Sequence, residues 1–140
     1  MSNCVFCKII AEGNPDDAIF EDERILVMLD MDWAVKGHTL VIWKKHFENA
    51  SELPVSDFKY FSEIFHKTEK ALLEVLQVDK SVVLKTGGLV SHFHFHIYPL
   101  KKETSWQIIK DIFDKKICYK AKPGEKEKLI SDLKKHFRIQ

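Results

Sequence analysis

Apolar residues follow two different periods along this chain of 140 residues. Residues 19–20, 24–29, 39–43 and 81–84 are short apolar or β-branched runs, which are typical of β-strands. Residues 91–99 alternate histidine with large apolar residues, which is typical of a fifth strand. We expect 39–43 to pair antiparallel with the strand before it, and the turn at 86–88 is short enough for a hairpin.

Three other stretches repeat apolar residues at spacings of three and four, the period of an α-helix. The longest begins at Ser56, and its stripe is a core face: Phe58, Phe61, Phe65, Thr68, Leu72 and Val75. A second helix is predicted through Trp106, Ile109 and Phe113, and a last one after Pro123-Gly124 with Leu129, Leu133 and Phe137. Strands and helices do not alternate regularly, so the pattern favours an α+β fold. We expect a mainly antiparallel five-stranded sheet, one long helix packed on it, and helices at the C-terminal end.

The 91–99 strand carries His92, His94 and His96 on one face, because successive strand side chains point to opposite sides. Neighbouring imidazoles would lie about 6.6 Å apart by strand rise, and two protonated rings would repel by roughly 2.5 kcal/mol at an effective dielectric near 20. At least one ring should therefore be neutral at pH 7. A neutral ring is suited to nucleophilic attack beside proton-donating neighbours, and equally to binding a metal. Both interpretations stay open at this point.

Further candidate residues lie near the ends of predicted elements. Cys4 and Cys7 stand three positions apart, as one tight knuckle around zinc requires, although this spacing alone is a weak signal. Asp30 follows a buried strand and stays open as an acid, a base or a ligand. Asp32 is interpreted as a turn residue that ends the strand.

Composition limits the classes of function. With 45% apolar and 31% charged residues, the chain is typical of one soluble globular domain spanning residues 1–140. No apolar run approaches the length of a membrane span, and the first residues lack the pattern of a signal peptide, so we expect a cytoplasmic protein. Three cysteines make a disulfide framework improbable. Residues 115–140 carry nine Lys and Arg against three Asp and Glu, which we interpret as a solvated helix face and not as a nucleic-acid site.

The chain resembles the histidine triad (HIT) family of nucleotide hydrolases and transferases, whose hallmark is His-φ-His-φ-His-φ-φ with φ apolar. Here the motif runs from His92 to Tyr98. The resemblance extends to residues 6–10, 20–23, 29–30 and 37–46, and it covers residues 4–100 at matching order and spacing. Residues 101–140, a C-terminal helical extension, match only loosely.

This resemblance implies a purine nucleotide bound at the histidine face and cleaved through a covalent nucleotidyl-histidine intermediate. The bond would be a phosphoramidate or a phosphoanhydride, as in a dinucleoside polyphosphate. The implied roles are His94 as nucleophile, His96 and His38 around the phosphate, and His92 as the residue that orients His94. The implied nucleotide contacts are Asp30 at the ribose and Phe6, Ile9, Leu29 and Met31 around the base. It also implies a homodimer with a continuous sheet. In members that carry the cysteines it implies a structural zinc, here held by Cys4, Cys7, His46 and His92.

The chain departs from the family pattern just before the triad. Members typically carry an Asn-rich loop with a Gly-Gln pair there, whereas residues 84–91 are several residues shorter. Lys85 stands where an asparagine is expected, and a lysine would offer a point charge to phosphate. Three functions stay open: a nucleotide hydrolase or nucleotidyl transferase, which we favour; a nucleotide-binding sensor or scaffold with little turnover; and a metal hydrolase that uses all three histidines. The sequence does not identify the leaving group.

Overall fold

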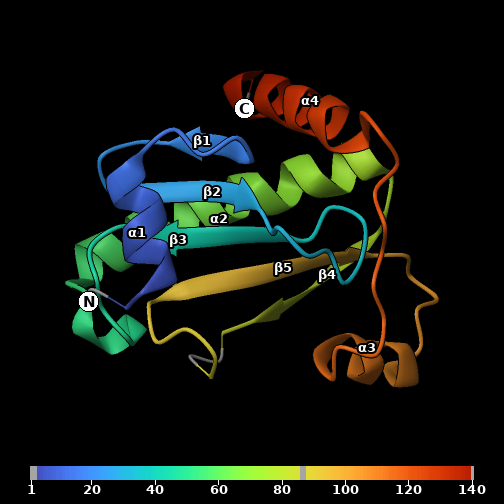
Figure 1. Cartoon of the computed structure of the whole chain (residues 1–140), viewed down its shortest axis with the longest axis horizontal. Helices are drawn as coiled ribbons and strands as arrows, with labels where there is room; N and C mark the ends of the chain where they lie inside the picture. The colour runs from blue at the N-terminus through green and yellow to red at the C-terminus, as the bar shows by residue number, and fades with distance from the viewer. Residues whose placement is uncertain (1–2, 86–87, 140) are drawn as a thin grey trace.

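The computed structural model describes residues 3–85 and 88–139, and its centre is an antiparallel sheet in the order β1-β2-β3-β5-β4 (Figure 1). The strands are β1 (Ala18–Glu21), β2 (Ile25–Leu29), β3 (Thr39–Trp43), β4 (Lys80–Leu84) and β5 (His94–Leu100). The helices are α1 (Val5–Glu12), α2 (Val55–Leu76), α3 (Trp106–Phe113) and α4 (Glu125–Ile139), with a short 3-10 turn at Ala50–Glu52. The expected α+β class is therefore confirmed. Part of the expected turn, Thr86-Gly87, lies outside the described residues.

The long helix α2 covers one face of the sheet. Its Phe61 ring lies 4.7 Å from Phe93 and 5.0 Å from Phe95, measured between ring centroids. The apolar half of the alternating strand therefore packs on α2, as its period predicts. Helix α4 packs beside α2 and β1 and buries Leu129 and Leu133 in the same cluster, so the C-terminal extension is part of the main core (Figure 1).

The opposite face of the sheet carries the histidines. Across it, Leu26 pairs with Ile42 and Ile42 with His94, while Met28 pairs with Leu40 and Leu40 with His96. Two helices border this face: α1 packs on one end through Phe6, and α3 on the other through Ile109 and Ile112. Figure 1 shows α1 crossing the sheet near the start of β5 and α3 lying toward its far end. The histidine face thus lies between α1 and α3.

The structure differs from the predicted elements at three places. The apolar periods predict no helix over residues 5–12, yet α1 forms there with Cys4 as its N-cap, whose Sγ accepts a hydrogen bond from the Cys7 amide. Strand β5 begins only at His94, since Phe93 donates its amide to the Phe47 carbonyl before the ladder starts. In α3 the buried residues are Ile109 and Ile112, while Trp106 is 68% exposed. No helix in the described ranges is long and apolar enough to cross a membrane.

Candidate functional site

A cluster of two thiols and two imidazoles lies where α1 meets the start of β5. His92 Nε2 donates to the Trp43 carbonyl at 2.5 Å, so the lone pair of its neutral ring is on Nδ1. That Nδ1 lies 3.4 Å from Cys4 Sγ, 3.6 Å from Cys7 Sγ and 3.1 Å from His46 Nδ1. Cys7 Sγ and His46 Nδ1 are 3.3 Å apart. The four candidate ligand atoms lie within 4.8 Å of one another.

These distances fit a tetrahedral zinc ion. With Zn–N near 2.0 Å and Zn–S near 2.3 Å, a regular tetrahedron puts two nitrogens about 3.3 Å apart and a nitrogen and a sulfur about 3.5 Å apart. The bond from His92 Nε2 to the Trp43 carbonyl is the outer contact that orients metal-binding histidines. Partial burial and the adjacent Cys4 thiol raise the pKa of Cys7. A bound cation would stabilise its thiolate form.

A second group of histidines forms a hydrogen-bonded chain with a backbone group at each end. At one end the Ala34 amide donates to His38 Nδ1 at 3.4 Å, which leaves the proton of this ring on Nε2. At the other end His94 Nδ1 lies 2.5 Å from the His92 carbonyl, which can only accept, so His94 carries its proton on Nδ1. Both tautomers are therefore set by the backbone.

The proton positions in the middle of this histidine chain follow from those at its two ends. His38 Nε2 lies 2.9 Å from His96 Nδ1 and donates to it. His96 then carries its proton on Nε2, which lies 3.1 Å from His94 Nε2. The lone pair of His94 Nε2 is thus held toward a proton donor. The two rings lean together, with centroids 4.8 Å apart, and are closer than strand rise alone predicted.

The histidines of this hydrogen-bonded group are neutral at pH 7. Burial lowers the pKa of His38 to about 4, and burial followed by the charges of His94 and His38 lowers the pKa of His96 to about 4. Burial also lowers the pKa of His94 and of His92. A neutral His94 is the form that has a lone pair for attack.

Asp30 lies beside this chain of histidines, one residue after the end of β2. Its Oδ2 lies 3.4 Å from His38 Nε2 and 3.9 Å from His96 Nδ1, and its Oδ1 accepts the Asp32 amide at 3.2 Å. The ligand atoms of Asp30, His38 and His96 are close enough for a metal. However, the Ala34 amide occupies His38 Nδ1 and leaves a proton on Nε2. We therefore interpret this group as hydrogen-bonded and not as a metal centre.

A model of the HIT domain family matches residues 11–103 of the chain. The protein belongs to the HIT family. An HIT-like protein of Methanocaldococcus jannaschii is 36% identical over 111 residues, 76% of this chain and 85% of the relative. An adenosine 5′-monophosphoramidase of Saccharomyces cerevisiae is 29% identical over 111 residues, 76% and 68% of the two chains. An adenylylsulfatase of Arabidopsis thaliana is 30% identical over 106 residues, 72% and 54%.

Solved structures show the same HIT fold. A hypothetical histidine triad nucleotide-binding protein of Sulfolobus tokodaii superposes with a TM-score of 0.78 at 24% identity, and the match covers 97% of this chain and 93% of that one. A zinc-bound histidine triad protein of Mycobacterium smegmatis superposes with a TM-score of 0.74 at 24% identity, covering 99% and 95%. The fold thus extends beyond the HIT domain into the C-terminal helices.

Within this HIT fold, two of the four residues expected around the base, Phe6 and Ile9, lie on the histidine side of the sheet. The Phe6 ring contacts the His94 ring edge-on at 4.7 Å, and Ile9 packs in the same cluster as Phe6. Met31, just past Asp30, is 66% exposed, and its carbonyl accepts a hydrogen bond from Lys126 of α4. Leu29 does not join them. It is fully buried in the layer under α2, on the opposite face of the sheet.

Sequence reasoning missed Met28, whose side chain packs with Phe6 on the histidine side. The run 25–29 is buried throughout and carries no alternation that would show which residues face which way. It also missed Tyr98, whose ring lies 4.2 Å from His38 and almost parallel to His96, at 11°. The period of two along the triad strand places Tyr98 on the histidine face, so that signal was available.

The structure also tests two expectations, one about Lys85 and one about a metal held by the three triad histidines. Lys85 Nζ donates to Asn49 Oδ1 at 2.7 Å, and its charge adds to burial in lowering the pKa of His94. A metal held by all three triad histidines is contradicted. His92 Nδ1 turns to the cysteines, whereas His94 and His96 meet through their Nε2 atoms.

Proposed function

We propose that this HIT protein hydrolyses purine nucleotides, or transfers their nucleotidyl group, by cleaving a phosphoramidate or phosphoanhydride bond at the α-phosphorus. The observation that carries the proposal is the state of His94, a neutral ring whose Nε2 lone pair is set by the bond from Nδ1 to the His92 carbonyl. The names of the yeast and plant relatives, a monophosphoramidase and an adenylylsulfatase, support an adenylyl group as the part retained.

In the first step His94 Nε2 attacks the α-phosphorus, and the bond from phosphorus to the leaving group breaks. The leaving group takes the electron pair and, if it is an amine, a proton from water. The neutral His96 keeps its Nε2 proton, 3.1 Å from the attacking atom, as a hydrogen-bond donor. In the second step water attacks phosphorus, the phosphorus–nitrogen bond breaks, and a nucleoside monophosphate leaves. Dividing the displacement into two steps lowers the barrier of each.

Substrate binding is assigned to residues around this chain of histidines. Asp30 accepts hydrogen bonds from the ribose hydroxyls, and Phe6, Ile9 and Met31 contact the base. His38 and His96 surround the phosphate, and Lys85 supplies positive charge beside His94. Leu29 is left out because it lies under α2.

A structural zinc ion completes the proposal. Cys4, Cys7, His46 and His92 would hold it, as their distances fit, and a zinc-bound protein of the same fold supports it. Such an ion would crosslink the N-terminal end of α1 to the residues that flank β3 and β5, and it would take no part in the reaction. His92 then acts as a positioning residue, because its carbonyl orients His94. The homodimer and the cytoplasmic location stay predictions.

The test is the turnover of adenosine 5′-monophosphoramidate by His94→Ala. We expect a loss of about a thousandfold or more, with AMP binding still measurable by calorimetry. The wild type, quenched during turnover, should carry an acid-labile adenylyl group that mass spectrometry detects and that the variant lacks. His66→Ala is the matched control, because His66 is an exposed histidine on α2. Near-native turnover by His94→Ala would overturn the covalent mechanism, and a wild type that binds AMP without turnover would favour the sensor or scaffold.

A further inference from the structure

A cavity of about 480 Å³ lies between the loop after β2 and the segment that joins α3 to α4. Residues 31–33 form one wall and residues 118–124 the other, with the first turn of α4 at one end. Figure 1 shows the joining segment running along the side of the molecule from α3 to α4. The cavity begins one residue after Asp30, but neither Asp30 nor any of the seven histidines lines it. It is therefore separate from the histidine site.

Hydrogen bonds hold the two walls of this cavity together. The Tyr119 amide donates to the Trp33 carbonyl at 2.9 Å, and Lys126 Nζ donates to the Met31 carbonyl at 3.0 Å. The Glu125 carboxylate accepts the Tyr119 hydroxyl at 2.6 Å, which ties the joining segment to the first residue of α4. The walls are thus formed in the fold itself, and a ligand would not have to order them.

Trp33 brings a donor without an acceptor to the cavity. The residue lines the cavity and is 2% exposed. Within the part of the chain that the structure describes, its Nε1 is the buried side-chain nitrogen or oxygen atom that lacks a hydrogen-bond partner. Folded proteins rarely leave a buried donor unpaired, because it has lost its bond to water and gained none. An acceptor atom of a ligand in the cavity would supply the missing bond.

The charges that line the cavity are positive in sum. Three ammonium groups, those of Lys120, Lys122 and Lys126, stand against the carboxylates of Asp32 and Glu127. One of the three is already oriented, since Lys126 Nζ lies 5.2 Å from the centroid of the Trp33 ring. The unpaired N–H and the nearest ammonium group are therefore on neighbouring side chains.

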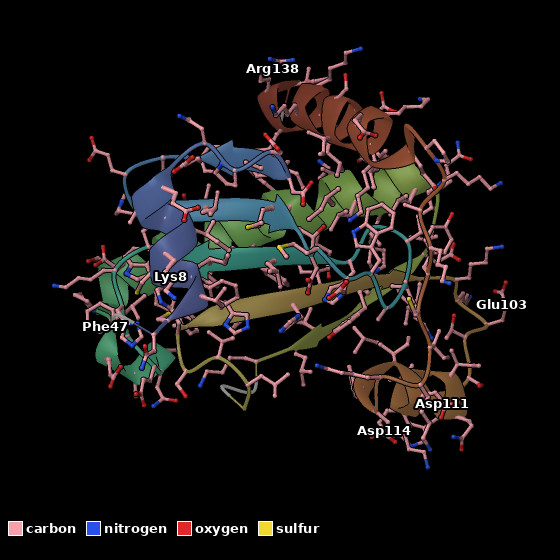
Figure 2. All side chains as sticks on the ribbon, viewed as in Figure 1. Lys8, Phe47, Glu103, Asp111, Asp114 and Arg138 are labelled. Atoms are coloured by element: carbon pink, nitrogen blue, oxygen red, sulfur yellow. The ribbon has the colours of Figure 1, made fainter. Side chains whose placement is uncertain are left out.

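The start of α4 adds to this positive character. Gly124, the residue before α4, lines the cavity with a φ of 81°, and a Cβ there would meet no atom within 4 Å. Glycine has no side chain to cap the first amides of the helix, whose dipole favours an anion at this end. Asp111 of α3 and Asp114 after it lie at the other end of the joining segment, away from α4 (Figure 2). The charge at the cavity is thus set by the residues that line it.

We propose that this cavity binds a small organic anion, whose phosphate or carboxylate oxygen accepts the indole N–H of Trp33. The lysines balance the charge of the anion, and its apolar part lies against Tyr119 and Pro123, which also line the cavity. An indole N–H can only donate, and a cation would meet three ammonium groups, so the chemistry of the walls favours an anion. The proposal does not depend on the reaction proposed at His94.

The first test follows the indole N–H signals of the ¹⁵N-labelled wild type by NMR, with phenyl phosphate as the probe. Its titration should move the Trp33 signal to saturation, because that N–H gains a charged acceptor. The signal of Trp106, an exposed tryptophan outside the cavity, should stay in place. Benzoate is the parallel probe: a shift with both supports a site for either oxyanion, and a shift with phenyl phosphate alone supports a phosphate site. A Trp33 signal that moves with neither probe would overturn the proposal.

The second test compares dissociation constants for phenyl phosphate, taken from the amide signal of Tyr119. Trp33→Phe should weaken binding about tenfold, as the loss of one hydrogen bond to a charged group supports. Lys122→Met should weaken it about twofold at low salt, and Lys134→Met, an exposed lysine farther along α4, is the matched control. If Trp33→Phe does not fold, the wild-type titration and Lys122→Met decide. Binding equally weakened by Lys134→Met, or lost in His94→Ala, would place the anion elsewhere and overturn the proposal.

Discussion

Replacing Cys4 with serine separates the effect of losing the proposed zinc ion from the effect of losing the N-cap of α1. Cys4 has two roles: its Sγ is near the other three ligand atoms, and the same Sγ caps α1 by accepting the Cys7 amide at 3.4 Å. Serine is among the preferred N-cap residues, so its hydroxyl keeps the cap while the thiolate is lost. A lower melting temperature of Cys4→Ser therefore reports the loss of the metal and not the loss of the helix cap.

The size of the effect follows from linkage. An ion that binds only the folded chain stabilises it by about 2.7 kcal/mol when its free concentration is one hundred times its dissociation constant. For a domain of this length that corresponds to a rise of about 10 °C in melting temperature. The wild type should show this rise between chelator and zinc, whereas Cys4→Ser should melt near the chelated wild type under both conditions.

The assay combines metal analysis with melting curves of protein purified without chelator and with zinc available. We expect about one zinc per chain in the wild type and none in Cys4→Ser. Cys118→Ser is the control, because Cys118 is exposed and outside the cluster, and it should keep both the metal and the melting temperature. Activity of Cys4→Ser should fall only in part, since the His92 carbonyl still accepts from His94 and Trp43 still holds His92. Metal-free wild type of undiminished stability would refute the reasoning.

Two further predictions concern Asp30 and pH. Asp30→Ala should weaken ribonucleotide binding by about 1.5 to 3 kcal/mol in calorimetry, because a charged hydrogen bond to the ribose is lost. An equal loss for 2′,3′-dideoxynucleotides would contradict the ribose contact. Burial holds the pKa of His38 and of His96 near 4 in the fold, against 6.5 ordinarily. The unfolded chain then binds protons first as the pH falls below 6.5. The free energy of unfolding in urea should therefore drop between pH 7 and pH 5, and the part due to His38 and His96 is at most about 2.7 kcal/mol per pH unit for two protons. A slope unchanged in a double variant, His38→Asn with His96→Asn, would show that other groups cause it.

Local pattern was enough for the class of fold and for the two faces of β5. The period of two separates Phe93 and Phe95 from His94 and His96, and the structure places the first pair on α2. The period of 3.6 likewise identifies the core face of α2. Such patterns work from sequence because side-chain direction within one element depends only on the backbone repeat.

Relations between elements needed the tertiary structure. All of β2 is buried, so only its register with β3, with Met28 opposite Leu40 and Leu40 opposite His96, shows that Met28 and not Leu29 faces the histidines. The tautomers needed it too, because the Ala34 amide and the His92 carbonyl that set them come from separate loops. Helix α3 comes to the site by packing on Tyr98, which no local repeat encodes. Hydrogen bonds and charges act through space, so the groups that decide proton positions and charge at this site are neighbours in the fold and distant in the chain.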